Sequence, residues 1–128
     1  MKISAKGQYA VRFMSELALN KEQAVSLSQI ANNQGISVKY LEQIVSKLAK
    51  ANLIEGLRGS MGGYRLAKSP EEISIKNILE TTGDTSNITP CVNGDCSRKK
   101  CKARNVWTNL GEIIDNYLSN ITLKDLIH

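Results

Sequence analysis

The sequence predicts a mainly α-helical fold with one small β-hairpin. Three observations lead to this prediction: two short helix signals separated by a tight turn, a glycine-rich segment between two short β-type runs, and a long amphipathic segment near the C-terminus. The 128 residues are enough for one domain with a real core. A hydrophobic content of 41% and a charged content of 23% are typical of soluble globular proteins, and no apolar run approaches the length of a membrane span.

The first part of the chain predicts three helices. Residues 8–20 place apolar side chains at helical spacing and predict the first. Ser26, with Gln29 three positions later, predicts a capping box, and Gly35 suits the left-handed end of a short second helix. Ser37 then caps a third helix, VKYLEQIVSKLAKAN. Its inward-facing positions are Leu41, Ile44, Val45 and Leu48.

The turn QGIS joins the second and third helices at the size of a helix-turn-helix, although any three-helix bundle shows the same spacing. The runs LIEGLR and YRLAK then flank the tip GSMGG and predict a β-hairpin. A hairpin directly after a helix-turn-helix is the wing of a winged helix; the alternative is a plain surface hairpin. We therefore predict a winged helix-turn-helix with a long C-terminal dimerisation helix.

The second part of the chain begins with a fourth helix, capped by Ser74, in which Ile73 staples onto Ile78 and whose role is packing. Residues 83–103 show no sustained periodicity and predict a long loop. A long helix follows over 104–120. Its apolar positions 106, 110, 113 and 117 alternate spacings of four and three, as a helix-helix seam requires.

This seam predicts a two-fold homodimer, and the alternative is a helix that only closes its own core. The motif TLKD then starts a short terminal helix. The expected division is a winged helix-turn-helix DNA-binding domain over 1–82, a cysteine-bearing sensor loop over 83–103, and the dimerisation helix with the terminal helix over 104–128.

The net charge of +5 is concentrated in the first half of the chain, which makes that half the candidate nucleic-acid face. Lysines of the third helix suit phosphate contacts, whereas Glu42 and Gln43 have the directional groups that read cytosine and adenine edges. A surface pair of Glu42 with Lys39 or Ser46 fits the spacing equally well. The candidate DNA-binding residues are Lys39, Tyr40, Glu42, Gln43, Lys47, Arg58, Gly59, Ser60 and Arg65.

All three cysteines, Cys91, Cys96 and Cys101, lie in the expected loop at intervals of five residues. The N-terminus lacks a signal-peptide pattern, so we expect a cytoplasmic protein, in which an odd cysteine count argues against a disulfide framework. Neighbouring lysines and arginines favour the thiolate form. The spacing alone leaves an iron-sulfur cluster, a zinc site with a fourth ligand such as Asp95, and a thiol switch equally open.

The sequence offers no support for an enzyme. It shows no paired carboxylates and no histidine-assisted nucleophile, and GSMGG is too short for a phosphate loop and lacks the following Lys-Ser/Thr.

Taken together, MKISAKGQYAV, GISVKYLEQIVSKL, RGSMGGYRLAK and the cysteine segment running into NVW…NITLKDL resemble the IscR/NsrR-type family of winged-helix bacterial transcription regulators, in its iron-sulfur cluster binding branch. The resemblance covers essentially the whole chain. It implies a winged-helix dimer, base contacts by Glu42 and Gln43, and Arg58 in a minor groove. It also implies an iron-sulfur cluster, two-iron two-sulfur favoured over four-iron four-sulfur, whose ligands are Cys91, Cys96 and Cys101.

The chain departs from these relatives in its cysteine segment. Four residues separate successive cysteines, whereas five are common in the family. Arg104 stands where the iron-sulfur assembly regulators have a histidine, and arginine has no lone pair for a metal. Gln8 stands where the nitric oxide sensors have an acidic residue, so the fourth ligand is unidentified. A further branch, the repressors of cysteine metabolism, lacks the three cysteines, and this chain looks unlike that branch.

The predicted function is a DNA-binding transcriptional regulator, not an enzyme, whose affinity for double-stranded operator DNA is controlled by an iron-sulfur cluster on the three cysteines. The alternative is a cluster-free repressor that acts as a thiol switch or binds zinc. The expected partners are operator DNA and a second copy of the chain, with no membrane.

Overall fold

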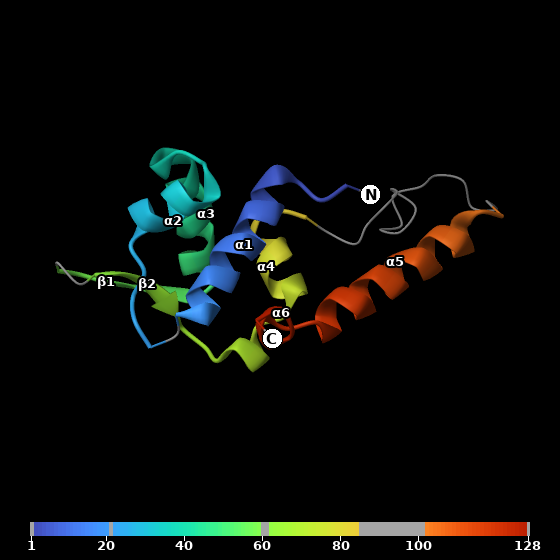
Figure 1. Cartoon of the computed structure of the whole chain (residues 1–128). Helices are drawn as coiled ribbons and strands as arrows, with labels where there is room; N and C mark the ends of the chain where they lie inside the picture. The colour runs from blue at the N-terminus through green and yellow to red at the C-terminus, as the bar shows by residue number, and fades with distance from the viewer. Residues whose placement is uncertain (1, 21, 60–61, 85–101, 128) are drawn as a thin grey trace.

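Two parts make up the molecule, a body of short helices and one long helix that extends from it (Figure 1). The computed structural model describes residues 2–20, 22–59, 62–84 and 102–127. The predicted mainly α-helical fold, with its winged helix-turn-helix and long C-terminal helix, is confirmed. The elements are α1 (Ala5–Leu19), α2 (Leu27–Gln34), α3 (Val38–Lys50), β1 (Ile54–Leu57), β2 (Gly63–Leu66), the 3₁₀ turn η1 (Pro70–Glu72), α4 (Ile75–Thr81), α5 (Arg104–Asn120) and α6 (Leu123–Leu126).

Serine side chains start the helices of the body, as predicted. The Oγ atoms of Ser26, Ser37 and Ser74 each accept a hydrogen bond from the backbone N–H three residues later, at 3.1–3.2 Å. Gly35 ends α2 in the left-handed conformation with φ 69°. The expected reciprocal bond from Gln29 is not formed, so α2 has half of the predicted capping box, whereas α4 and α6 have complete ones.

The first helix begins earlier than predicted, at Ala5 rather than at Gln8. The reason is an N-cap at Ser4, whose Oγ accepts from the N–H of Gly7 at 3.0 Å. The expected fourth helix is also preceded by a separate turn, because Pro70 starts η1 and the chain is extended again at Ile73 before α4 begins.

The core of the body joins α1 to α2, α3, α4 and α6. The predicted inward positions of α3 are all buried, which confirms that face of the helix. The largest fully buried side chains are Phe13, Met14, Leu17, Ile30, Leu41, Ile44, Leu48, Ile73, Ile78 and Leu123. Because Leu123 belongs to α6, the terminal helix packs with the body.

The wing is fastened to the helix-turn-helix. Strands β1 and β2 pair in antiparallel register, from Ile54 opposite Leu66 to Leu57 opposite Gly63. Val25, just before the cap of α2, pairs with Tyr64 through two backbone hydrogen bonds of 2.9 Å. Gly63 has φ 151°, and a Cβ there would collide with the carbonyl oxygen of Val25. The glycine therefore permits a close approach that holds the wing beside α2.

Backbone hydrogen bonds attach the chain just after α5 to the body. The N–H of Ile75 donates to the carbonyl of Ile121 at 2.9 Å, and the N–H of Leu123 donates to the carbonyl of Ile73 at 3.0 Å. Toward its N-terminus α5 projects away, on the side of the body opposite the wing (Figure 1). Among the described helices, none combines the length and apolar character needed to cross a membrane.

Candidate nucleic-acid interface and sensor segment

A groove of about 590 Å³ separates α3 from the wing. The start of α2 forms its third side. The pairing of Val25 with Tyr64 fixes the wing against α2. The three sides of the groove therefore keep a fixed position relative to one another. Its lining includes Ser28 of α2, Val38 and Glu42 of α3, and Leu57 and Arg58 of the wing.

The outer face of α3 presents charged and amide side chains to solvent. The N-cap at Ser37 sets where the helix begins, and the buried positions then turn the remaining ones outward. Four of the candidate DNA-binding residues lie exposed on this face: Lys39, Glu42, Gln43 and Lys47. Such a face offers cations for phosphates beside groups that accept or donate directional hydrogen bonds.

The carboxylate of Glu42 is not neutralised by a neighbouring lysine. Within the described ranges, the ion pairs join Arg65 to Glu55, Lys76 to Asp115, and Lys124 to Glu71. The surface pair of Glu42 with Lys39 that fits the spacing is therefore not formed. Glu42 stays exposed on the groove wall.

Two other candidate residues have partners within the fold. Tyr40 is half-buried, and its ring meets that of Tyr9 of α1 edge to face with centroids 5.8 Å apart. The guanidinium of Arg12 lies 5.4 Å from the centre of the Tyr9 ring. Arg65 donates from Nε to Glu55 at 2.5 Å across the hairpin. Tyr40 thus packs α3 on α1, and Arg65 braces the wing.

The tip of the wing carries the remaining candidates. Arg58 is exposed and borders the groove. The carbonyl of Gly59 accepts from the N–H of Gly62 at 3.0 Å, which closes the turn. Ser60 lies outside the described residues.

Cys91, Cys96 and Cys101 also lie outside the described residues, but the chain is described on both sides of them. On the N-terminal side, Asp84 accepts from the backbone N–H of Ser4 at 2.9 Å and from its Oγ at 2.7 Å. The hydroxyl of Thr82 donates to the same carboxylate at 2.8 Å. Burial disfavours the charged form of Asp84, but these hydrogen bonds outweigh burial and hold its pKa below the ordinary value.

The contact between Asp84 and Ser4 joins the start of the cysteine segment to the cap of α1. It is packed closely, because a Cβ at Gly7 would collide with the carboxylate of Asp84. No local sequence pattern signals this contact, since its partners are 80 positions apart. The pairing of Val25 with Tyr64 is likewise not signalled by a local pattern, apart from the glycine that precedes Tyr64.

On the C-terminal side, the cysteine segment leads directly into α5. Ala103 occupies the N-cap position and offers no side-chain acceptor. Arg104, the first residue of α5, is half-buried. Gln8 is the second residue considered as a possible fourth ligand. Its side-chain amide donates to the carbonyl of Ile3 at 3.2 Å. In the described ranges, no three His, Cys, Asp or Glu side chains are grouped as a metal site.

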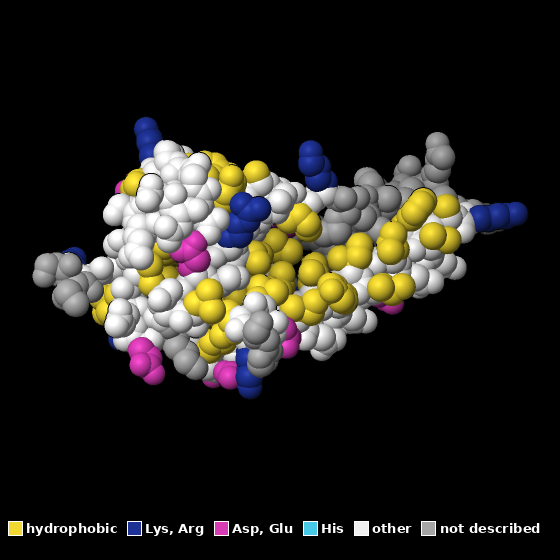
Figure 2. All heavy atoms as spheres, viewed as in Figure 1, with side chains coloured by type: hydrophobic (Ala, Val, Ile, Leu, Met, Phe, Trp, Pro, Cys, Tyr) yellow, Lys and Arg dark blue, Asp and Glu magenta, His cyan; other side chains and the backbone are white. Residues whose placement is uncertain are grey.

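Helix α5 exposes a band of large apolar side chains. Figure 2 shows hydrophobic side chains along its visible face and on the adjoining body. Ile113 and Tyr117 are 64% and 65% exposed, and Gly111 is the one buried residue of this helix. The band consists of Val106, Trp107, Leu110, Ile113 and Tyr117, and it contains all four positions of the predicted seam. Most of the large apolar side chains of this band are therefore exposed in the single chain.

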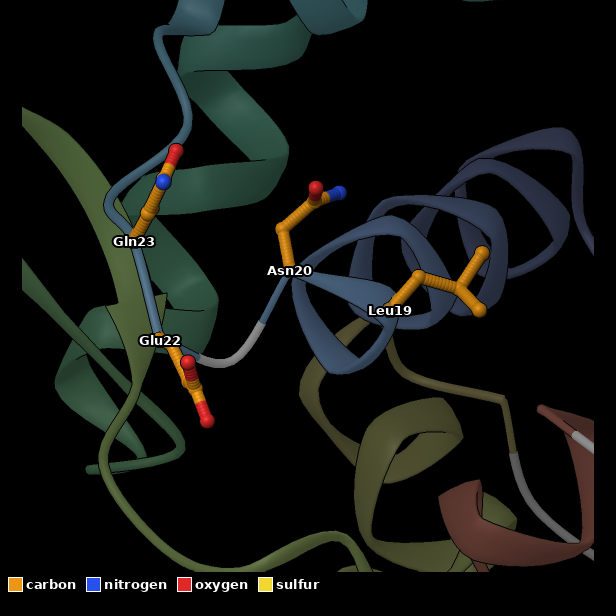
Figure 3. A pocket seen from close by; sticks show the side chains of 4 residues that line it. All are labelled: Leu19, Asn20, Glu22 and Gln23. Atoms are coloured by element: carbon orange, nitrogen blue, oxygen red, sulfur yellow. The ribbon is translucent and has the colours of Figure 1, made fainter.

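One further hollow, of about 350 Å³, lies where α1 ends. Leu19, Asn20, Glu22 and Gln23 line it, and Figure 3 shows their side chains pointing in different directions. Polar groups that converge on one point would be needed to bind a small molecule, so this hollow has no features of a ligand site.

The family model for Rrf2, described as iron-dependent transcriptional regulators, matches residues 3–128. The chain belongs to the Rrf2 family. IscR of Vibrio cholerae, an HTH-type transcriptional regulator, is 40% identical over 130 residues, which cover 99% of this chain and 75% of that protein. The Rrf2 family is one of DNA-binding transcriptional regulators, so this protein acts on DNA and is not an enzyme.

Solved structures agree with this assignment. CymR of Bacillus subtilis, the global cysteine regulator, superposes with a TM-score of 0.87 at 33% identity and covers 99% of this chain and 96% of its own. IscR of T. potens superposes with a TM-score of 0.81 at 35% identity and covers 99% and 86%. The fold is thus shared by regulators from both branches, and the likeness of folds does not choose between them.

Proposed function

We propose that this Rrf2-family regulator is a homodimeric repressor whose hold on operator DNA changes with an iron-sulfur cluster bound by Cys91, Cys96 and Cys101. The observation that carries the proposal is the attachment of the cysteine segment. One end is bonded through Asp84 to the cap of α1, and the other end continues into α5 at Arg104. A change within the segment therefore acts on both parts of the molecule.

The DNA contacts follow from the exposed face of α3 and from the wing. Lys39 and Lys47 suit phosphates, and these contacts set affinity and its dependence on salt. Glu42 is suited to accept from cytosine N4, and Gln43 to bridge adenine. Arg58 at the wing tip has the charge that a narrow minor groove attracts.

The dimer follows from the apolar band of α5. Side chains exposed to this degree on one helix face favour association, and an isologous pairing of two α5 helices buries the band on both copies. Such a pairing places two copies of α3 on one duplex. Recognition helices of a two-fold dimer meet successive major grooves when they lie about 34 Å apart, so a modest change in the angle of α5 alters binding.

The donor set suits iron-sulfur chemistry. Three thiolates ligate iron strongly, and lysines and arginines on either side of Cys101 stabilise the deprotonated sulfur. Neither Gln8 nor Arg104 is a good fourth ligand, so a cluster held by the three cysteines would have one position without an identified strong ligand. The cluster would supply a centre that is lost or altered by oxygen, nitric oxide or iron shortage. A two-iron two-sulfur cluster is favoured over a four-iron four-sulfur cluster.

The test is anaerobic purification followed by counting of iron and sulfide per chain and an absorption spectrum. The wild-type protein should contain stoichiometric iron and sulfide and be coloured. Cys96→Ala should lose most of the iron and remain a folded dimer, whereas Ser97→Ala, in the same segment but without a donor sulfur, should keep it. A Cys96→Ala variant with a full complement of iron contradicts the cluster assignment. So does a colourless, iron-free wild-type protein after reconstitution, which would favour zinc or a thiol switch.

A further inference from the structure

Two apolar side chains are exposed on the walls of the groove between α3 and the wing. Val38 and Leu57 are each 39% exposed, and both line the groove. Over the described part of the chain, neither belongs to the hydrophobic core or to the half-buried residues packed against it. Ile36, two positions before Val38, does pack on the core, as does Leu41 after it. Val38 is therefore an apolar residue without a role in the core.

The place of Val38 on α3 makes this exposure meaningful. It is the first residue of the helix, directly after the N-cap Ser37. A β-branched residue contributes little to helix stability at such a position. In helix-turn-helix proteins, the N-terminal residues of the second helix are those that contact base edges. Val38 thus occupies a reading position with a side chain that can make only apolar contacts.

Val38 also shares its face of α3 with Glu42. The two are four positions apart, which places one above the other on a helix, and both line the groove. One helical turn is about 5.4 Å and one base step about 3.4 Å. Four residues rise about 6 Å along the helix axis, so the two side chains fall on base pairs that are one or two steps apart.

The major groove contains one apolar group, the C5-methyl of thymine. We infer that Val38 is a specificity-determining residue that contacts a thymine methyl in each operator half-site, within two base pairs of the one that Glu42 reads. This inference rests on the proposed DNA-binding function. It adds a residue that selects T·A by burial of a methyl group rather than by a hydrogen bond.

The experiment uses the full chain and synthetic DNA. A duplex is first selected by the wild-type protein from a randomised library at fixed salt. Each thymine is then replaced, one at a time, by deoxyuridine, which removes the methyl group and keeps base pairing. The dissociation constants are measured for the wild-type protein, for Val38→Ala, and for Leu19→Ala as the control. Leu19 is 66% exposed and lies at the end of α1, away from the groove.

The expected result is one thymine per half-site whose replacement weakens wild-type binding about fourfold, the effect of losing one buried methyl group. Val38→Ala has a shorter apolar side chain and should reduce the difference between the thymine and uracil duplexes, whereas Leu19→Ala should keep the fourfold difference. Circular dichroism and thermal unfolding verify that both variants fold.

Three outcomes overturn the inference while leaving the regulator proposal intact: a selected site without a required thymine, uracil duplexes that all bind as tightly as thymine duplexes, or an unchanged fourfold loss in Val38→Ala. Failure of the library to enrich any duplex is a different result. It would contradict the proposed DNA-binding function itself, and the inference with it.

Discussion

The body and the long helix differ in how far their apolar side chains are buried. In the body, α3 buries Leu41, Ile44, Val45 and Leu48 and exposes its charged residues. In α5, the large apolar residues at the seam are exposed, and Gly111 alone is buried. Both helices are amphipathic in sequence. Within the described residues α3 buries its apolar face, whereas α5 packs Leu118 on the core and leaves the apolar band exposed.

This difference separates two tasks. A self-sufficient body can present α3 and the wing in a fixed geometry, because Val25 holds the wing and Tyr40 holds α3 on α1. The exposed helix suits the proposed association with a second copy. The ion pair of Lys76 with Asp115, at 2.7 Å, is one of the links between α4 and α5.

The largest effect should come from a charge in the apolar band. Ile113→Asp places a carboxylate in the proposed dimer contact, so the dimer should dissociate. Operator binding should then weaken about 100-fold or more, because each half-site is bound separately. Analytical ultracentrifugation and DNA titration measure the two effects.

Asn116→Asp adds the same charge at an exposed polar position of α5 and should change neither property. If Ile113→Asp remains dimeric, the proposed role of α5 is wrong.

Loss of a buried side chain should destabilise the body itself. Leu48→Ala should lower the free energy of unfolding by about 2–5 kcal/mol, since Leu48 is fully buried. Denaturant unfolding should show this loss at every protein concentration. Leu110→Ala in α5 should instead have an effect that depends on protein concentration, because Leu110 is 40% exposed in the single chain. Equal, concentration-independent losses in both variants would remove the distinction between the two regions.

Smaller changes are expected on the face of α3. Glu42→Ala should relax discrimination at one base pair by about 1–3 kcal/mol, because the variant lacks the acceptor for cytosine N4. Competition between single-base variants of the selected duplex measures this loss. A variant that keeps full discrimination would exclude Glu42 as a base reader.

Lys47→Ala should weaken binding to all sequences alike and lower the slope of log affinity against log salt by about 2, about 1 for each copy in the dimer. Titrations at several salt concentrations provide the slope. Lys124→Ala, at an exposed lysine of α6, is the matched control and should leave the slope unchanged.

The smallest expected effect concerns the link between the cysteine segment and α1. The pKa of Asp84 is lowered in the folded state, so its contribution to stability is present above the ordinary carboxyl pKa, about 3.9. It is lost as the pH falls through the folded-state pKa. Asp84→Asn should therefore be less stable than wild type at neutral pH, and this deficit should shrink below about pH 4. Unfolding at several pH values, with Glu112→Gln as control, measures it; a deficit independent of pH would contradict the account.

The sequence predicted those features that are set locally. Helix starts are predicted within a few residues by the N-cap serines Ser26, Ser37 and Ser74. The alternating spacing of apolar residues in α5 predicts the seam whose side chains are exposed. The start of α1 was predicted too late because the apolar periodicity begins only at Ala10, after Gly7, whereas the helix is capped at Ser4.

Contacts between distant parts of the chain could not be predicted in this way. The bond between Ser4 and Asp84 and the bridge between Val25 and Tyr64 depend on tertiary packing, which leaves no periodic signal. Residue types indicated which side chains suit DNA contacts. The structure was needed to show that Lys47 is exposed and that Tyr40 is half-buried. The structure also brought Val38 and Arg58 to one groove, although they come from different elements.

The most direct test of the central claim is the operator affinity of three samples under anaerobic conditions: cluster-loaded wild type, wild type stripped of iron, and Cys96→Ala. The account predicts that the dissociation constant of the loaded protein differs from the other two by about 5- to 150-fold, the usual range of coupling between two sites. Equal dissociation constants for all three samples would contradict it.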